Sequence, residues 1–270
     1  MSVINTNLAS LNAQRNLMSS QTDLQTSLQR LSSGLRVNSA KDDAAGLSIA
    51  TKMDSQIRGM TVAARNANDG ISMIQTADGA LSNVSDALQR IRELAVQGAN
   101  ETNGTAEWSN IDTEVQALNT EIGRIATDTK FNGTAVLSST ATTKNIQIGA
   151  DSGQQIQISI GADTAYAGMT IGAISDSASA AAALSQVDDA LAALNTERSS
   201  LGTAQNRMGY AINNLNSSIE NQTAAKSRIM DTDFASETAK LTRSQILQQA
   251  GTAMLAQANQ LPNGVMSLLR

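Results

Sequence analysis

Apolar residues recur at every third or fourth position from Leu47 to Ala95, and no other feature limits the possible folds of this chain as strongly. An unbroken stripe of this kind predicts one amphipathic helix of about 50 residues, which would measure about 75 Å at about 1.5 Å per residue. The whole sequence contains a single proline, so the usual helix breaker is nearly absent. Only 2% of the residues are aromatic, which leaves Ala and the aliphatic side chains to fill a core, as they do where helices pack side by side. We therefore expect a mainly α-helical protein.

Two further helical stripes follow, with a different pattern between them. A short stripe runs from Trp108 to Ile125, and a long one runs in heptad steps from Leu184 to Ile229. Between these stripes the stretch NIQIGADSGQQIQISIG alternates polar and apolar residues around a turn, which predicts a β-hairpin. The fold expected from these patterns is a long antiparallel helical rod with a small β-hairpin region.

Polar residues and glycines interrupt the two long stripes. Four of the fourteen heptad positions in the second stripe are polar, and they are either ordinary interruptions or buried polar residues that set the register of the helices. These four are Arg198, Gln205, Gln222 and Lys226. A glycine inside a helix costs about 1 kcal/mol relative to alanine, so we interpret the glycines as points where neighbouring helices approach closely. They are Gly46, Gly59, Gly70, Gly79, Gly202 and Gly209.

Narrow apolar stripes lie at both ends of the chain, where chains are usually polar and frayed. Asn, Gln, Ser and Thr flank these stripes, and helix nucleation is costly, so neither end is expected to form a stable helix alone. If the two long helices pack antiparallel, both ends emerge together and can pair with each other and with other copies. Because an apolar surface that a monomer cannot bury is a surface for assembly, we expect the ends to be buried only in a polymer. The residues assigned to this assembly surface are Ile4, Leu8, Leu11, Leu28, Leu31, Leu35, Leu247, Met254, Leu255, Leu261 and Leu268.

Composition argues against several classes of protein. The formal net charge of −5 and the pI of about 4.8 give no basic field for nucleic acid or anionic lipid. The chain has no cysteine and no histidine, so it lacks disulfides, thiolate and imidazole catalysis, and the commonest zinc ligands. The acidic pairs in KDDAAG and VDDALAAL fit helix starts better than acid–base catalysis. No apolar run is long enough to span a bilayer, and MSVINTNLAS does not resemble a cleavable secretion signal. We expect no enzyme activity, metal or cofactor.

Several blocks of the sequence resemble one protein family in their order and spacing. The blocks VINTNLASLNAQRNL, LQRLSSGLRVNSAKDDAAGLSIA and ALQRIRELAVQGAN are similar to the N-terminal part of bacterial flagellin. The block SRIMDTDFASETAKLTRSQILQQAGTAMLAQANQLPNGVMSLLR is similar to its C-terminal part. The resemblance runs to about residue 137 and resumes over about the last 90 residues. The middle leaves room for a hairpin but not for the outer, variable domains of many flagellins, so the resemblance indicates a short form.

This resemblance implies a fold and a role. Residues 1–40 and 232–270 would pair as a coiled coil that lines the channel of a filament, and residues 41–231 would form a rod. The rod would contain three helices, at residues 44–98, 105–128 and 180–229. A β-hairpin region would lie at residues 134–175. The implied role is that of a structural subunit, which polymerises into the bacterial flagellar filament for swimming motility. Such subunits leave the cell unfolded through the flagellar type III export apparatus and are added at the tip, outside the cell.

The implied partners are copies of the chain itself, an export chaperone at the C-terminal segment, and the filament cap and hook-junction proteins. In a vertebrate host, the resemblance also implies recognition by Toll-like receptor 5 through the helix LQRIRELAVQ and the helix after it. The residues carried over to that surface are Gln89, Arg90, Glu93, Leu94, Gln97 and Glu114. The same face could instead pack against neighbouring subunits or form solvated ion pairs.

Two other functions stay open at this point. A hook–filament junction protein shares flagellin-like ends, although the match through both long helices favours flagellin itself. An amphipathic, membrane-active secreted protein would use the two ends as lipid anchors. Helices of that kind are usually basic on one face and carry Trp or Phe on the other, and the ends of this chain show neither property strongly.

Overall fold

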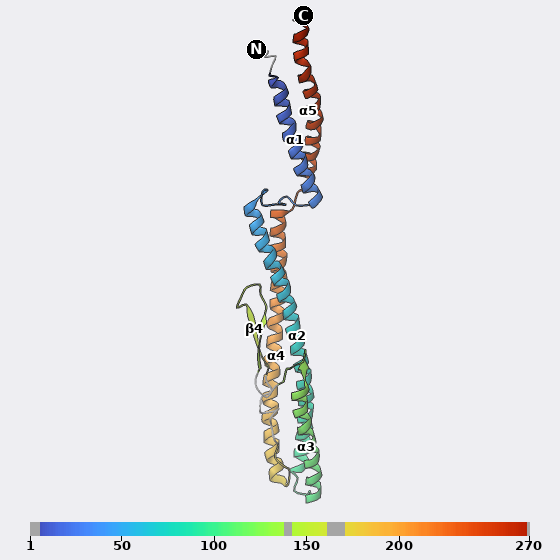
Figure 1. Cartoon of the computed structure of the whole chain (residues 1–270). Coiled ribbons are helices and arrows are strands. Elements are labelled where there is room, and N and C mark those ends of the chain that lie inside the picture. The colour runs from blue at the N-terminus through green and yellow to red at the C-terminus, as the bar shows by residue number, and fades with distance from the viewer. Residues whose placement is uncertain (1–5, 138–141, 161–170, 269–270) are drawn as a thin grey trace. The chain divides into compact units, whose positions relative to one another are not determined.

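The computed structural model describes residues 6–137, 142–160 and 171–268. Five α-helices and two small antiparallel strand pairs make up this part of the chain (Figure 1). The helices are α1 (Leu8–Ser33), α2 (Ala44–Gly98), α3 (Thr105–Asp128), α4 (Ser177–Met230) and α5 (Phe234–Leu268). The strands are β1 (Lys130–Phe131), β2 (Thr134–Ala135), β3 (Thr142–Gln147) and β4 (Gln155–Ile160). The mainly α-helical class with a small β-hairpin region, expected from the sequence, is confirmed.

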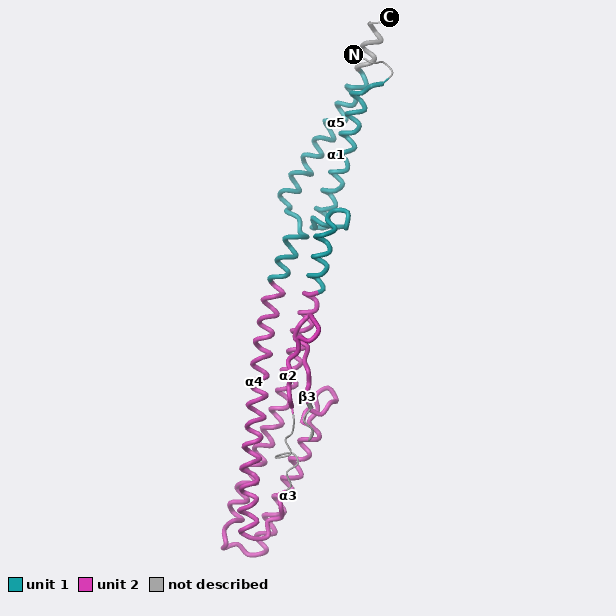
Figure 2. Tube along the Cα trace, turned by 90° about the vertical axis from the view of Figure 1, so that its left-hand side faces the viewer, with its two compact units in different colours: residues 1–55, 221–270 teal, residues 56–220 magenta. Residues whose placement is uncertain are grey.

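The chain divides into two compact units (Figure 2). Unit 1 comprises residues 1–55 and 221–270, and unit 2 comprises residues 56–220. Unit 1 therefore holds α1 and α5 with the adjoining ends of α2 and α4, while unit 2 holds α3, the strands and the rest of the two long helices. The domain borders expected at residues 40 and 231 stay predictions.

The core of unit 2 forms where α2, α3 and α4 pack together along the apolar stripes of the sequence. Trp108 of α3 adds a specific contact, because its Nε1 donates a hydrogen bond to the carbonyl oxygen of Gly98 at 2.8 Å. Full burial of a large aliphatic side chain contributes about 1.5–3 kcal/mol, so unit 2 has an apolar core of its own. Its largest fully buried side chains include Ile74, Leu81, Leu88, Ile91, Ile122, Ile158, Ile160 and Leu194.

The two strand pairs follow from local sequence. Strands β1 and β2 leave Asn132 and Gly133 as a two-residue turn, with φ angles of 48° and 77°. Positive φ at both positions is the requirement of a type I′ turn, for which Asn–Gly is a preferred sequence. Strand β4 buries every second residue against the core, as the alternating pattern predicts. The register of β3 and β4 runs from Thr142 opposite Ile160 to Gln147 opposite Gln155.

Ion pairs occupy two of the four polar positions in the second long stripe. In unit 2, Arg198 Nε lies 2.8 Å from Asp78 Oδ1, and in unit 1, Lys226 Nζ pairs with the carboxylate of Asp54. The four side chains are between 30% and 46% exposed, so each pair adds little stability. None of the four polar side chains of this stripe is buried. They are therefore ordinary interruptions of the stripe and not buried residues that set its register.

The six glycines of the long stripes fall into three groups. Gly46 stands alone, because an added Cβ there would meet the carboxylate of Asp43, just before α2, and not a neighbouring helix. A Cβ atom added at Gly59 would lie 2.9 Å from the Cβ of Ala150, which follows β3, so the hairpin approaches α2 closely at this point. An added Cβ at Gly70 would lie 2.9 Å from the side chain of Met208 in α4. The close-approach interpretation is wrong, within the described residues, where an added Cβ has no atom within 4 Å: at Gly79, Gly202 and Gly209.

We expect Gly59→Ala to lower the free energy of unfolding by about 1 kcal/mol, because the new methyl group displaces the turn between β3 and β4. The matched control, Gly79→Ala on the same helix, should raise that free energy by about 1 kcal/mol, because only helix propensity changes there. Urea unfolding followed by circular dichroism measures both values. Equal gains in the two variants would contradict a tight contact at Gly59.

Candidate assembly surface on the terminal helices

Helices α1 and α5 pack against each other as an antiparallel pair within unit 1 (Figure 1). The hydrogen bonds between them join the start of α1 to the later part of α5, and the end of α1 to the start of α5. This pairing of the terminal helices, which was part of the expected fold, is confirmed. The bonds run from Asn7 Nδ2 to the carbonyl oxygen of Ala258 (2.7 Å), from Ser10 Oγ to Asn259 Oδ1 (2.8 Å) and from Ser27 Oγ to Glu237 Oε1 (2.7 Å).

Local sequence determines where α1 begins and ends. The side chain of Asn7 accepts a hydrogen bond from the backbone N–H of Ser10 at 3.1 Å, which caps the first turn. Gly34 ends the helix in the left-handed region, with a φ of 73°, and its N–H donates to the carbonyl oxygen of Arg30 at 2.9 Å. These two caps fix the segment of chain that faces α5.

Burial on the helix pair is the reverse of that in an ordinary core. Up to residue 260, beyond which burial is not described, the buried residues of α1 and α5 are small or polar: Ser10, Ser27, Glu237, Ser244 and Ala258. Several of their large apolar residues are exposed instead, and Met18 is 70% exposed while Leu8, Ile246 and Met254 are each 60% exposed. Contiguous exposed apolar surface on a protein marks a site of interaction. The pair therefore presents apolar side chains that no described residue covers.

The residues assigned to assembly from the sequence fall into three groups. Five are exposed: Leu8, Leu11, Leu28, Leu247 and Met254. Three are half-buried: Leu31, Leu35 and Leu255. Ile4 and the side chains of Leu261 and Leu268 lie outside the described residues. Met18, which shares the helical spacing of Leu8 and Leu11, is also exposed. Phe234 and Ile246 are exposed as well, and the apolar spacing of the sequence did not indicate them.

The exposed surface of the helix pair contains a groove between α1 and α5. It has a volume of about 370 Å³ and is lined by Leu17, Leu247 and Met254 together with Asn12 and Asn16. Close approach of the two helices forms its floor, because a Cβ added at Gly251 would lie 3.1 Å from Leu17 Cδ1. Apolar walls with a few amide groups fit another protein surface better than a charged ligand.

The second predicted site, on α2 and α3 of unit 2, is built around one guanidinium. Arg90 Nη1 lies 2.9 Å from Glu93 Oε2, and Arg90 Nη2 lies 2.9 Å from Glu114 Oε1. The hydrogen bonds to Glu93 and Glu114 raise the pKa of Arg90 above its ordinary value. All three side chains are about half exposed, so the cluster is accessible and adds little stability.

The other members of that site differ in exposure. Gln89 and Gln97 are exposed on α2 beside the charged cluster. Leu94 is only 3% exposed and lies in the core of unit 2, so the expectation that its side chain belongs to a surface is corrected. It follows Ile91 by three residues, and that spacing places both on the buried face of α2.

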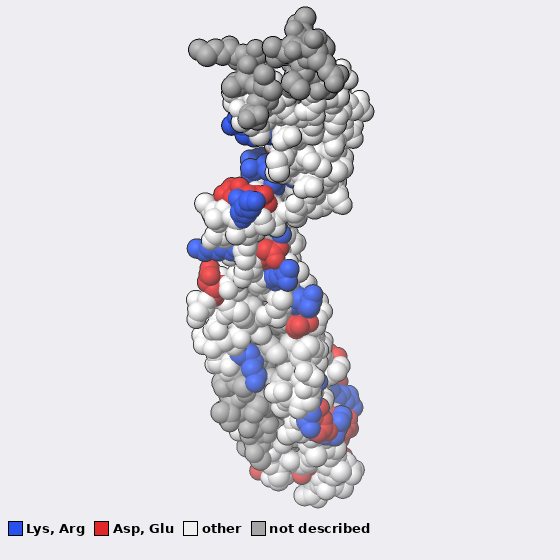
Figure 3. Space-filling view, turned by 45° about the horizontal axis from the view of Figure 1, so that its top comes forward, with Lys and Arg blue, Asp and Glu red and all other residues white. Residues whose placement is uncertain are grey.

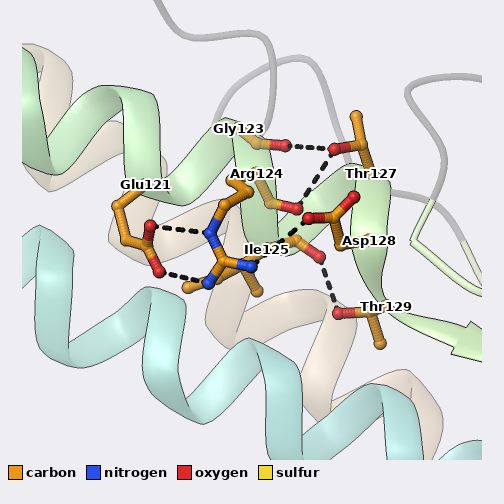
Figure 4. A network of polar contacts seen from close by, with 7 residues as sticks. All are labelled: Glu121, Gly123, Arg124, Ile125, Thr127, Asp128 and Thr129. Atoms are coloured by element: carbon orange, nitrogen blue, oxygen red, sulfur yellow. Dashed lines mark hydrogen bonds and ion pairs between the residues drawn. The ribbon is translucent and has the colours of Figure 1, made fainter.

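A third polar network lies on the last turns of α3 (Figure 4). The guanidinium of Arg124 bonds both carboxylate oxygens of Glu121, at 2.8 Å and 2.5 Å, and reaches Asp128 Oδ2 at 3.3 Å. All its partners lie three or four residues away on the same helix, which is the spacing of ordinary helix-stabilising pairs. We therefore assign this network to α3 itself and not to a binding site.

Comparison with known proteins identifies the family. A model described as the bacterial flagellin N-terminal helical region matches residues 4–142, and one described as the bacterial flagellin C-terminal helical region matches residues 184–269. The chain belongs to the bacterial flagellin family. The resemblance seen in the sequence is thus confirmed, and with it the role of a structural subunit of the flagellar filament.

Several relatives align with this flagellin over nearly its whole length. A flagellin of Halalkalibacterium halodurans is 46% identical over 99% of this chain and 100% of its own length. A flagellin of Bacillus subtilis is 43% identical over 99% of each chain, and the flagellar filament 33 kDa core protein of Treponema phagedenis is 42% identical over 99% of this chain and 100% of its own. A short flagellin is the form that these alignments support, because they span nearly the whole length of these relatives.

A solved structure supports the fold as well. The crystal structure of Bacillus cereus flagellin is 33% identical, with a TM-score of 0.52, and covers 56% of this chain and 88% of that one. Flagellins are structural proteins, and the described residues of this one hold no cluster of three or more His, Cys, Asp or Glu side chains suited to a metal ion. Among the described helices, none combines the length and apolarity needed to cross a membrane.

Proposed function

We propose that this flagellin polymerises through the paired helices at its two ends, and that the exposed apolar side chains of α1 and α5 become buried between copies. The observation that carries the proposal is the reversed burial of this pair, with serine and alanine inside and Leu8, Met18 and Met254 outside. Burial of apolar surface stabilises an assembly by about 25 cal/mol for each Å² removed from water. The proposed borders of the assembly part are residues 1–40 and 232–270.

We also propose the route by which the subunit reaches the filament. It is exported unfolded through the flagellar type III apparatus, secreted from the cell and added at the filament tip, where the cap and hook-junction proteins are its partners. An export chaperone binds the C-terminal segment, because α5 exposes large apolar side chains such as Ile246 and Met254 that need a cover before assembly. The absence of cysteine suits this route, since an unfolded chain without thiols forms no disulfides in transit.

A further proposed partner is Toll-like receptor 5 of a vertebrate host. Its contact surface would comprise Gln89, Arg90, Glu93, Gln97 and Glu114, which are exposed on neighbouring turns of α2 and α3. The burial of Leu94 removes that side chain from the proposed surface. An exposed, charged cluster of this kind fits electrostatic recognition by a protein partner.

The polymerisation proposal is tested by deleting residues 1–40 and 232–270. We expect a helical, soluble monomer that unfolds cooperatively, because the buried core of unit 2 remains. The full chain, seeded with filament fragments, should form filaments visible by electron microscopy, and the truncated chain should form none. Filaments of the truncated chain, or the loss of its cooperative transition, would contradict the proposed division of roles.

A further inference from the structure

The charged residues of the terminal helix pair are few and gathered in one place. Helices α1 and α5 contain six charged side chains in all, and white surface dominates around these helices on the face drawn in Figure 3. Five of the six line one pocket of about 210 Å³ between the two helices. They are Asp23, Arg30, Glu237, Lys240 and Arg243, and the sixth, Arg15, is not among the residues of this pocket. Three cations thus meet two carboxylates in this pocket, and Arg15 is the one other charged residue of the two helices.

One of the carboxylates is fully engaged within the chain. Glu237 is 3% exposed, accepts a hydrogen bond from Ser27 Oγ at 2.7 Å and pairs with Lys240 Nζ at 3.1 Å. Burial would raise the pKa of this carboxyl, but the hydrogen bonds from Ser27 and Lys240 and the charges of Lys240 and Arg30 outweigh it and hold the pKa below its ordinary value. Glu237 is therefore ionised at neutral pH, and its two oxygens already have partners.

Two guanidiniums of the pocket keep unused donors. Arg30 Nε is buried and has no hydrogen-bond partner, which leaves a polar atom away from water without the bond it requires. Arg243 lines the same pocket and forms no ion pair with any described residue. Guanidinium groups present paired donors that match the two oxygens of a carboxylate or another oxyanion. Among the described residues no carboxylate pairs with these two guanidiniums, and Asp23, which lines the pocket too, is no exception. The pocket therefore offers their donors to a further acidic group.

Charge on the chain as a whole points to the source of that group. Unit 1 carries ten Lys and Arg residues against seven Asp and Glu, whereas unit 2 carries nine against seventeen. Every copy of the chain therefore brings an excess of carboxylates to any neighbour. The pocket lies between the same two helices that expose Met18, Leu247 and Met254, so a copy that covers this apolar surface reaches the pocket as well.

We propose that the pocket lined by Arg30, Lys240 and Arg243 binds an acidic side chain of a second copy of this chain during assembly. The inference rests on the proposed polymerisation through α1 and α5 and adds to it a specific polar contact. Apolar contacts tolerate small shifts between two copies. A carboxylate that accepts hydrogen bonds from two guanidiniums keeps those bonds in one position only. The pocket would therefore fix how copies align, in addition to helping hold them together.

The test compares Arg243→Gln with Arg15→Gln in the full chain. Both variants remove one positive charge from an exposed arginine of the same helix pair, but only Arg243 lines the pocket. At low salt we expect the critical concentration for seeded polymerisation to rise about tenfold in Arg243→Gln and less than twofold in Arg15→Gln. The difference should shrink as added salt screens the contact. Circular dichroism of each monomer checks that the helices are unchanged.

Three further results bear on the proposal. Loss of assembly in Arg243→Glu with partial recovery in Arg243→Lys would support a carboxylate partner, because lysine restores the charge without the paired donors. Equal critical concentrations for the wild type and both glutamine variants would overturn the pocket proposal while leaving polymerisation itself intact. Saturable binding of inorganic phosphate to the monomer that only Arg243→Gln abolishes, without a change in critical concentration, would overturn the second copy as occupant. Failure of the wild type to polymerise would instead contradict the proposed function.

Discussion

The Met254→Asp variant should fold as a monomer and fail to form filaments. Met254 is 60% exposed in the isolated chain, so a carboxylate at this position stays in water and costs the monomer little. Once a second copy covers the surface, the same carboxylate is buried without a partner, at a cost of several kcal/mol per subunit. We expect the critical concentration to rise at least about a thousandfold, measured by sedimentation of seeded samples. Leu255→Asp, at the half-buried neighbouring position, should behave in the same way.

The matched control for this result is Gln249→Asp. Gln249 is an exposed polar residue of α5, so the variant adds the same charge to the same helix without placing it on the apolar surface. We expect its critical concentration to stay within about tenfold of the wild type. A variant at Met254 that still seeds normal filaments, or a control that is equally defective, would show that these apolar side chains do not drive assembly.

Periodicity made the long helices predictable, because the spacing of apolar residues along α2 is a local property of the sequence. The turn at Asn132 and Gly133, which was not predicted, also depends on local sequence, since Asn–Gly is a preferred pair where both φ angles are positive. Leu94 shows the limit of reasoning from spacing. Arg90, Glu93 and Leu94 are close together in the sequence, but only Leu94 lies on the buried face of α2. Arg90 and Glu93 are exposed.

Contacts between distant parts of the chain could not be predicted from the local spacing of residues. The polar pocket needs Arg30 and Arg243 to meet across more than two hundred residues, and nothing in either local sequence indicates the register that brings them together. The same holds for the pairing of Lys226 with Asp54, although the heptad pattern did mark Lys226 as an unusual polar position. The prediction for Gly79 was wrong. A glycine destabilises a helix, so its presence suggested a close contact with a neighbouring helix, but no described atom lies within 4 Å of a Cβ added there.

Hydrogen exchange should separate the behaviour of the terminal helices from that of the rest of the chain. The interface of α1 and α5 buries mostly serine and alanine, together with the glycine contact at Gly251, so little apolar area holds the pair together in a monomer. The ordering of these helices costs conformational entropy, and only contacts with further copies offset it. We therefore expect fast exchange of backbone amides in residues 1–40 and 232–270 of the monomer.

Assembly should slow that exchange by about a thousandfold, which corresponds to about 4 kcal/mol of added protection. Residues 47–95 and 184–229 should be protected in the monomer and in the filament alike, because their apolar stripes are already buried within one chain. Met254→Asp serves as the control, since a chain that cannot assemble should keep its fast-exchanging ends under filament-forming conditions. Strong protection of both ends in a verified monomer would overturn this account. It would mean that α1 and α5 are stable with their large apolar side chains in water, and assembly would then add contacts to a finished structure instead of completing an unfinished one.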